Sequence, residues 1–305
     1  MLKFKSLFWF CLGCTFMASA SDTTRVLFIG NSFTGNNDMP GIFQKICRAK
    51  QKVVHVEKCW KGGASLKDQT ARPELFEAIK KGKWDVIVVQ GWSKEFVQDR
   101  EYIDTATLPY ATKILDTIKA HNPCAQILFY ETWAYRDGCE KDSVKLSFEE
   151  MSDTIIKGYA YMNSIFNHPV VPVGRTWLSF RQKHPDINLY DTDLYHPSKS
   201  GSYLAATTFF TSINYIDSYK ICVLPNPMEG NLLTIELRSA SPNQTKEISK
   251  INLYNTIGNE LIIENYTSNQ SYTDVLLSNQ LAPGIYLLGI TLETGEYIST
   301  KFVAK

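Results

Sequence analysis

A serine stands where the first apolar run of the sequence ends. The run from Val26 to Ile29 is followed by Gly30, Asn31 and Ser32. If this run is a strand of a parallel sheet, Ser32 lies at its carboxyl end beside free backbone N–H groups, a position that suits a nucleophilic hydroxyl. A serine in such a turn also commonly caps the next helix, so this segment alone leaves both interpretations open.

An aspartate and a histidine stand three residues apart near position 195. One loop can hold Asp193 and His196 so that the carboxylate fixes the imidazole tautomer and leaves the other ring nitrogen free to accept a proton. Pro197 and Ser198 then begin a helix, expected to run to about Tyr215, whose start would hold this loop rigidly. Of the five histidines, only His196 has an aspartate at this spacing.

In chain order, Ser32, Asp193 and His196 supply a nucleophile, an orienting carboxylate and a base. The sequence contains no Gly-x-Ser-x-Gly segment, which argues against an ordinary α/β-hydrolase. It also contains no His-Glu-x-x-His, aspartate-rich loop or phosphate-binding glycine run, so we expect neither a metal nor a cofactor.

Strands and helices that could position these residues alternate along the first two thirds of the chain. Amphipathic segments, such as residues 105–120 and 148–166, separate short apolar runs. This alternation predicts an α/β fold with a parallel sheet, in which ligands bind beyond the carboxyl ends of the strands. The expected strands are residues 26–29, 53–56, 85–89, 126–130 and 170–173.

The two motif segments resemble the SGNH (GDSL-type) hydrolases, particularly a Bacteroidetes-rich branch of secreted members. Gly-Asn-Ser at 30–32 and Asp-x-x-His-Pro-Ser at 193–198 match the family's first and last blocks, and the resemblance covers roughly residues 24–218. It implies a flavodoxin-like three-layer sandwich with a parallel five-stranded sheet. It also implies that the catalytic residues are the serine, aspartate and histidine named above.

The resemblance further implies an oxyanion hole made by Ser32, Gly63 and Gln90. Gly63 best matches the family's N–H-donating glycine, and Gly62 is an adjacent alternative. The third block departs from the family, because Gln90 stands where asparagine is usual. Its amide could donate to the oxyanion as asparagine does, or it could simply be a hydrogen-bonding residue at the end of a strand.

Three aromatic residues follow the ends of the expected strands and could line a substrate cleft. These are Trp92, Trp133 and Tyr135. Aromatic residues are at least as often part of a core, so the sequence leaves their role in substrate binding open.

After residue 219 the sequence changes to short alternating runs separated by turn residues, which predicts a small antiparallel β-sandwich. Segments 224–227, 251–258, 281–287 and 300–305 resemble the landmarks of a type A sorting domain of the Bacteroidetes type IX secretion system. The resemblance implies that the type IX machinery is a partner, with the cargo released or attached to the cell surface and the domain usually cleaved. A carbohydrate-binding accessory module is the alternative.

Residues 1–20 read as a secretory signal peptide that ends at Ala18-Ser19-Ala20. The apolar run is too short to span a membrane, and Cys14 raises a lipoprotein alternative. We therefore expect three segments: a signal peptide at 1–20, an α/β domain at 21–219 and a sorting domain at 220–305. We expect no transmembrane segment in the mature chain.

Five of the seven cysteines lie beyond the signal peptide, so at least one thiol is unpaired. The sequence leaves the pairing open: Cys47 and Cys59 form the most local pair, and buried free thiols are an equal alternative.

The charge balance points to no polyanionic partner. The chain has 32 Lys and Arg against 31 Asp and Glu, and loss of the two leader lysines gives 30 against 31. A near-neutral exported chain gives no indication of nucleic-acid binding. The combined hypothesis is a secreted serine esterase acting on O-acyl groups, above all acetyl, of carbohydrates. The alternative is a weakly active or inactive SGNH-like scaffold that binds glycans at the cell surface.

Overall fold

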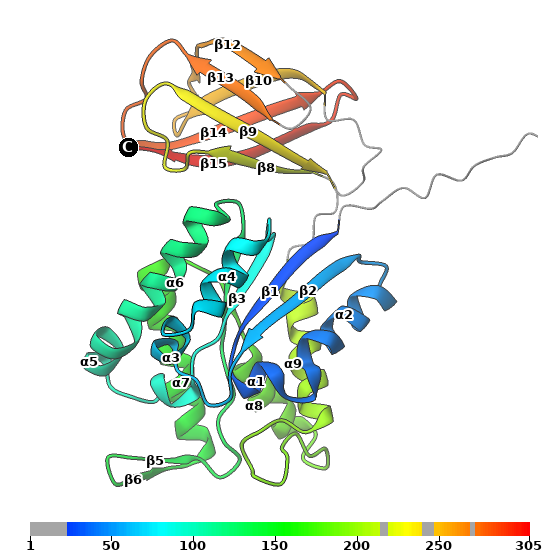
Figure 1. The fold of residues 1–305 in the computed structure, drawn as a ribbon, viewed down its shortest axis with the longest axis vertical. Helices are drawn as coiled ribbons and strands as arrows, with labels where there is room; N and C mark the ends of the chain where they lie inside the picture. The colour runs from blue at the N-terminus through cyan, green and yellow to red at the C-terminus, as the bar shows by residue number, and fades with distance from the viewer. Residues whose placement is uncertain (1–22, 214–218, 240–246, 269–271) are drawn as a thin grey trace, which may run out of the picture.

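Five parallel strands form the central sheet of the first domain in the computed structural model, which describes residues 23–213, 219–239, 247–268 and 272–305. The strand order is β2-β1-β3-β4-β7. Neighbouring strands pair in parallel, and helices lie on both sides of the sheet (Figure 1). This is the expected flavodoxin-like three-layer arrangement. The strands are β1 Thr24–Gly30, β2 Val54–Trp60, β3 Val86–Val89, β4 Gln126–Tyr130 and β7 Val170–Val171.

The helices follow the strands, as the amphipathic segments predicted. Helix α2 packs against α9, and α4 packs against α6. The expected helix 105–120 is observed as α6, and a π-helical stretch at Ile103–Thr107 comes directly before it. The longer helices are α2 Met39–Ala49, α4 Pro73–Lys81, α6 Leu108–His121, α7 Phe148–Phe166, α8 Val173–Lys183 and α9 Lys199–Ser212.

The central strands are apolar because both of their faces are covered. Residues 26–29 and 86–89 are at most 1% exposed, and helices pack on them from both sides. Strand β1 lies between β2 and β3, with Gly30 in register with Trp60 and Ile29 in register with Val89. The loops that follow these three strands therefore meet at one edge of the sheet, and this edge holds the candidate site.

Two four-stranded antiparallel sheets form the C-terminal domain and share one apolar core. Their orders are β11-β10-β14-β15 and β12-β13-β9-β8. Leu233, Leu253, Val275 and Leu288 from both sheets are fully buried, so the expected β-sandwich is present. The strands are β8 Tyr219–Leu224, β9 Leu232–Ser239, β10 Ile248–Asn255, β11 Glu260–Leu261, β12 Ile263–Ser268, β13 Thr273–Leu277, β14 Gly284–Leu292 and β15 Tyr297–Ala304.

The predicted segment boundaries fall partly outside the described residues. The proposed signal peptide at 1–20 lies there, so the boundary after residue 20 stays a prediction. The predicted boundary after residue 219 falls one residue into β8 and also stays a prediction. Within the described part of the chain, no helix combines the length and the apolar character needed to cross a membrane.

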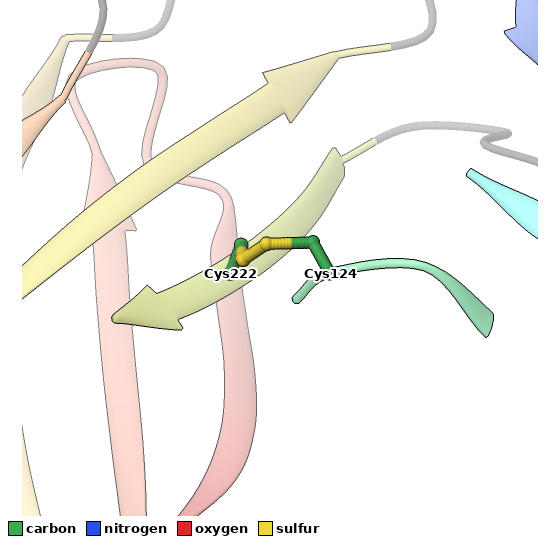
Figure 2. The surroundings of a disulfide bond; sticks show 2 residues. All are labelled: Cys124 and Cys222. Atoms are coloured by element: carbon green, nitrogen blue, oxygen red, sulfur yellow. A yellow bond between two sulfur atoms is a disulfide. The ribbon is translucent and has the colours of Figure 1, made fainter. Parts of the chain in front are cut away.

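One disulfide joins the two domains (Figure 2). It connects Cys124, in the loop before β4, with Cys222 of β8. Cys47, Cys59 and Cys139 are buried and form no disulfide, so the most local pair, Cys47 with Cys59, is not formed. Because Cys124 precedes a strand of the parallel sheet, the bridge lies at the amino end of that sheet, away from the edge that holds the candidate site.

The disulfide predicts a definite thiol count. In denaturant without reductant, a chain starting at residue 21 should react with a thiol reagent at three cysteines, and after reduction at five. The variant Cys222→Ser should show four reactive cysteines both without reductant and after reduction. Five reactive thiols in the unreduced wild-type chain would contradict the bridge.

Candidate active site

The end of β1 places the Ser32 hydroxyl at the edge of the sheet. Asn31 is the N-cap of the short helix α1 (Ser32–Gly35), and its side chain accepts a hydrogen bond from the backbone N–H of Phe33. Ser32 is therefore the first residue of the helix and does not cap it. Gly30 is required just before, because a Cβ there would lie 2.3 Å from Gln90 Oε1.

The loop before α9 holds Asp193 and His196, as the spacing predicted. Asp191 N donates to the carbonyl of His196, and Leu194 N donates to the carbonyl of Asp191. Ser198 caps α9 by accepting from Gly201 N at 3.2 Å, which fixes the end of the loop to a rigid helix.

Ser32, His196 and Asp193 form a continuous hydrogen-bonded chain. His196 Nε2 lies 2.7 Å from Ser32 Oγ, and His196 Nδ1 lies 2.5 Å from Asp193 Oδ2. The other carboxylate oxygen, Oδ1, accepts from the backbone N–H groups of residues 195 and 196. Burial alone would raise the pKa of Asp193, but the hydrogen bonds from His196 and the backbone outweigh it, so this pKa lies below its ordinary value. Asp193 is therefore charged at neutral pH, as an orienting carboxylate must be.

Two backbone N–H groups of the residues that line the pocket are free to bind an oxyanion. Within the described residues, the N–H groups of Ser32 and Gly63 make no hydrogen bond to the protein. Gly63 has φ of +66°, a conformation that favours glycine, and Gly62 beside it lines the same pocket. Asn31 Nδ2 donates to Ala64 O at 3.2 Å and thereby joins the glycine loop to the serine turn.

The structure turns Gln90 away from this pocket. Gln90 is fully buried, and its Nε2 donates to Asn31 Oδ1 at 2.7 Å and to Gly91 O at 2.8 Å. Its Oε1 accepts from Asn31 N and Thr34 Oγ1. Both amide hydrogens are thus committed, so the expectation that Gln90 donates to the oxyanion does not fit this geometry. Gln90 instead holds the serine turn against the end of β3.

A pocket of about 480 Å³ opens at the triad. Trp92 and Tyr135 line it, so of the two positions that the sequence left open for them, cleft or core, the structure has the cleft. Trp133 does not, because it is 1% exposed and stacks between Phe33 and Trp177 in the core. A larger hollow of about 780 Å³, lined largely by α4 and α6, contains no triad residue. The full lining of the smaller pocket is Asn31, Ser32, Phe33, Gly62, Gly63, Trp92, Lys94, Tyr135, Tyr195 and His196.

Four lining residues were not predicted from the sequence: Asn31, Phe33, Lys94 and Tyr195. Asn31, Phe33 and Tyr195 each stand next to a predicted catalytic residue, and this adjacency was the available signal. Lys94 carried no signal, because its inclusion depends on how the chain turns after β3.

A buried carboxyl group joins two walls of the pocket. Glu95, 1% exposed, accepts hydrogen bonds from Trp92 N at 2.6 Å and from Leu66 N at 3.2 Å. Burial raises the pKa of Glu95 to about 7, although these two N–H donors lower it in part, and the charge of Asp68 raises it slightly. Glu95 therefore links the loop after β2 to the loop after β3.

Glu95 should make the stability of the protein depend on pH. Between about 4.5 and about 7, the unfolded chain loses the Glu95 proton and the folded chain keeps it, so the free energy of unfolding falls as pH rises through this window. Relative to Glu95→Gln, the wild type should lose about 2 to 3 kcal/mol between pH 5 and pH 8. Urea unfolding of both proteins at several pH values measures this difference.

An exposed glutamate on α4 provides the control for that series. Glu77→Gln removes one carboxylate from the surface and should leave the pH dependence of the unfolding free energy as in the wild type. Parallel curves for the wild type and Glu95→Gln would contradict the raised pKa.

Comparisons with known proteins agree with this two-part organisation. The family model for the secretion system C-terminal sorting domain matches residues 222–305. A DUF4886 family protein from Bacteroides uniformis superposes with a TM-score of 0.53 at 20% identity, covering 63% of this chain and 83% of its own. An acetyl xylan esterase superposes with a TM-score of 0.49 at 14% identity, covering 62% of this chain and 100% of its own. A sequence search of curated proteins finds no match.

These findings define an α/β domain of the fold that the SGNH resemblance implied, followed by a sorting domain. The C-terminal segment is a secretion system C-terminal sorting domain and indicates export by the type IX system. The likeness of the α/β domain to the DUF4886 protein concerns the fold alone, so the chemistry must be derived from the site.

Proposed function

We propose that the protein is an exported serine esterase. The observation that carries the proposal is the hydrogen-bonded chain from Ser32 Oγ through the imidazole of His196 to Asp193, with distances of 2.7 and 2.5 Å. A serine, a base and an orienting carboxylate in this geometry are the components of nucleophilic acyl transfer.

In the proposed reaction, Ser32 Oγ attacks the ester carbonyl carbon and His196 Nε2 takes the hydroxyl proton. The carbon–oxygen bond of the ester breaks, and His196 returns the proton to the departing alcohol. Water then attacks the acyl-enzyme with the help of His196 and releases the acid and free Ser32. Asp193 stays charged throughout and stabilises the imidazolium that forms in each half-reaction.

The developing oxyanion would be bound by the N–H groups of Ser32 and Gly63. Both are free of protein acceptors in the described residues, and both residues line the pocket. Gln90 would serve this step indirectly, by holding Asn31 and the serine turn in place. The remaining hydrogen of Asn31 Nδ2 is the candidate for a third donor, since one hydrogen is used by Ala64 and Asn31 lines the pocket.

The proposed substrates are O-acyl esters of carbohydrates, with acetyl as the preferred group. The resemblance to secreted SGNH hydrolases supports the acetyl preference, and the aromatic side chains of Trp92, Tyr135 and Tyr195 in the pocket suit a sugar ring. Export by the sorting domain would bring the enzyme to such substrates, in released or surface-attached form.

The test is the release of p-nitrophenol from acetate, butyrate and octanoate esters by the chain from residue 21. We expect turnover of all three or of the shorter two, with acetate fastest. A correctly folded chain that releases nothing above the buffer rate would remove the esterase proposal and favour a glycan-binding scaffold.

A further inference from the structure

Lys94 is the one lysine or arginine among the residues that line the active-site pocket. It lies in the short 3-10 helix Ser93–Glu95 after β3, and it is half-buried beside Trp92, with Nζ 5.9 Å from the centroid of the Trp92 ring. In the described part of the chain, no carboxylate lies within ion-pair distance of this amine. The pocket thus holds a cation that the protein itself does not neutralise.

The carboxyl groups of Glu95 and Asp193, which lie close in sequence to lining residues, are engaged elsewhere. Glu95, next in sequence, is buried and accepts from the backbone N–H groups of residues 66 and 92. Asp193 is held by His196 and by two backbone N–H groups. Neither acid is available to pair with Lys94, so its charge is left for a ligand.

Aromatic rings line the same pocket as Lys94, Ser32 and His196. Tyr135 and Tyr195 lie 5.4 Å apart between ring centroids, and Tyr195 lies 4.4 Å from the ring of His196. With Trp92, they give the pocket flat apolar surfaces and phenol hydroxyls, which suit the C–H faces and hydroxyls of a sugar ring. A volume of about 480 Å³ has room for a monosaccharide unit.

We propose that the preferred substrate is an acyl ester of an acidic sugar, whose carboxylate binds Lys94 while the acyl group lies at Ser32. This inference rests on the esterase function proposed above and specifies its substrate class. An ammonium–carboxylate pair at a half-buried site is stronger than one on the open surface, because less water screens it. The charge of Lys94 therefore selects for an anionic substrate.

The experiment compares two substrates that differ only in charge: the O-acetylated methyl glycoside of galacturonic acid and the corresponding neutral uronamide. Acetate release gives kcat/KM for each. We expect the wild-type enzyme to prefer the acid about tenfold at low ionic strength, and the preference to shrink in 0.5 M NaCl because salt screens the pair. In Lys94→Gln the ratio should fall to about one.

A second lysine provides the matched control. Lys61 is exposed and stands next to Gly62, but it is outside the pocket lining, so Lys61→Gln should keep the wild-type ratio. Equal kcat/KM for acid and amide in the wild type, or an unchanged ratio in Lys94→Gln, would overturn the inference while p-nitrophenyl acetate hydrolysis still supported the esterase. Inactivity of the wild type on both sugars and on p-nitrophenyl acetate would remove the proposed function and this inference together.

Discussion

Replacing Ser32 by alanine should lower kcat/KM for p-nitrophenyl acetate by at least about 10³-fold. The hydroxyl is the nucleophile of the proposed reaction, and among the described residues its one hydrogen-bond partner is His196 Nε2. Without it, His196 and the oxyanion donors can at most promote direct attack by water. The measurement is the initial rate with the wild type and the variant at equal protein concentration.

The variant should fold as the wild type does. Ser32 is the first residue of α1, Asn31 provides the cap, and alanine is compatible with a helix. Ser200→Ala, at an exposed position in the first turn of α9, is the control and should keep full activity. A Ser32→Ala protein that retains more than about a tenth of the wild-type rate would contradict the role of this hydroxyl.

Asp193→Asn should lower kcat by about 10³- to 10⁴-fold with a small change in KM. The carboxylate accepts from His196 Nδ1 through Oδ2 and from two backbone N–H groups through Oδ1. An asparagine that keeps the backbone contacts turns its NH₂ toward Nδ1, so the imidazole must present its unprotonated nitrogen there. Nε2 then carries the proton and cannot accept another from Ser32.

The matched control for this variant lies two residues earlier in the same loop. Asp191 is exposed, and within the part of the chain that the structure describes its side chain accepts one hydrogen bond, from the adjacent Thr192 N. Asp191→Asn changes the charge of the loop without touching the imidazole and should stay within about twofold of the wild-type kcat. Equal losses in the two variants would show that loop charge, rather than the tautomer of His196, causes the effect.

The positions of the three triad residues follow from where the parallel strands end and from the short Asp193–His196 spacing. Apolar runs bounded by turn residues fix where the parallel strands end, and the carboxyl ends of β1, β2 and β3 must meet at one edge. The short Asp193–His196 spacing and the capped helix after it then fix the second half of the site. These features are local, so the sequence could indicate where the three residues lie, and the SGNH resemblance supplied the roles proposed for them.

The orientation of Gln90 could not be predicted in the same way. Whether its amide faces the pocket or the serine turn depends on two residues across the sheet edge. Asn31 accepts from the Gln90 amide and also donates to it, and Thr34 donates to it. The same limit applies to Trp133, since nothing local distinguishes a pocket aromatic from one that stacks between Phe33 and Trp177.

Several strands also escaped prediction, for a related reason. β12 is exposed at nearly every position and shows no alternation of apolar and polar residues, and the hairpin of β5 (Cys139–Lys141) and β6 (Val144–Leu146) is too short to show a period. The pairing of Cys124 with Cys222 spans 98 residues and depends on how the two domains meet, which the spacing of cysteines does not encode.

The most direct test of the central claim is covalent labelling by a fluorophosphonate. Attack by an activated serine on phosphorus displaces fluoride and leaves a stable phosphonyl ester, and the reaction needs no knowledge of the natural substrate. Peptide mass spectrometry should find one adduct, on Ser32, in the wild type and none in Ser32→Ala. A folded wild-type protein that stays unlabelled at Ser32, or is labelled at another serine, would contradict the proposed esterase mechanism.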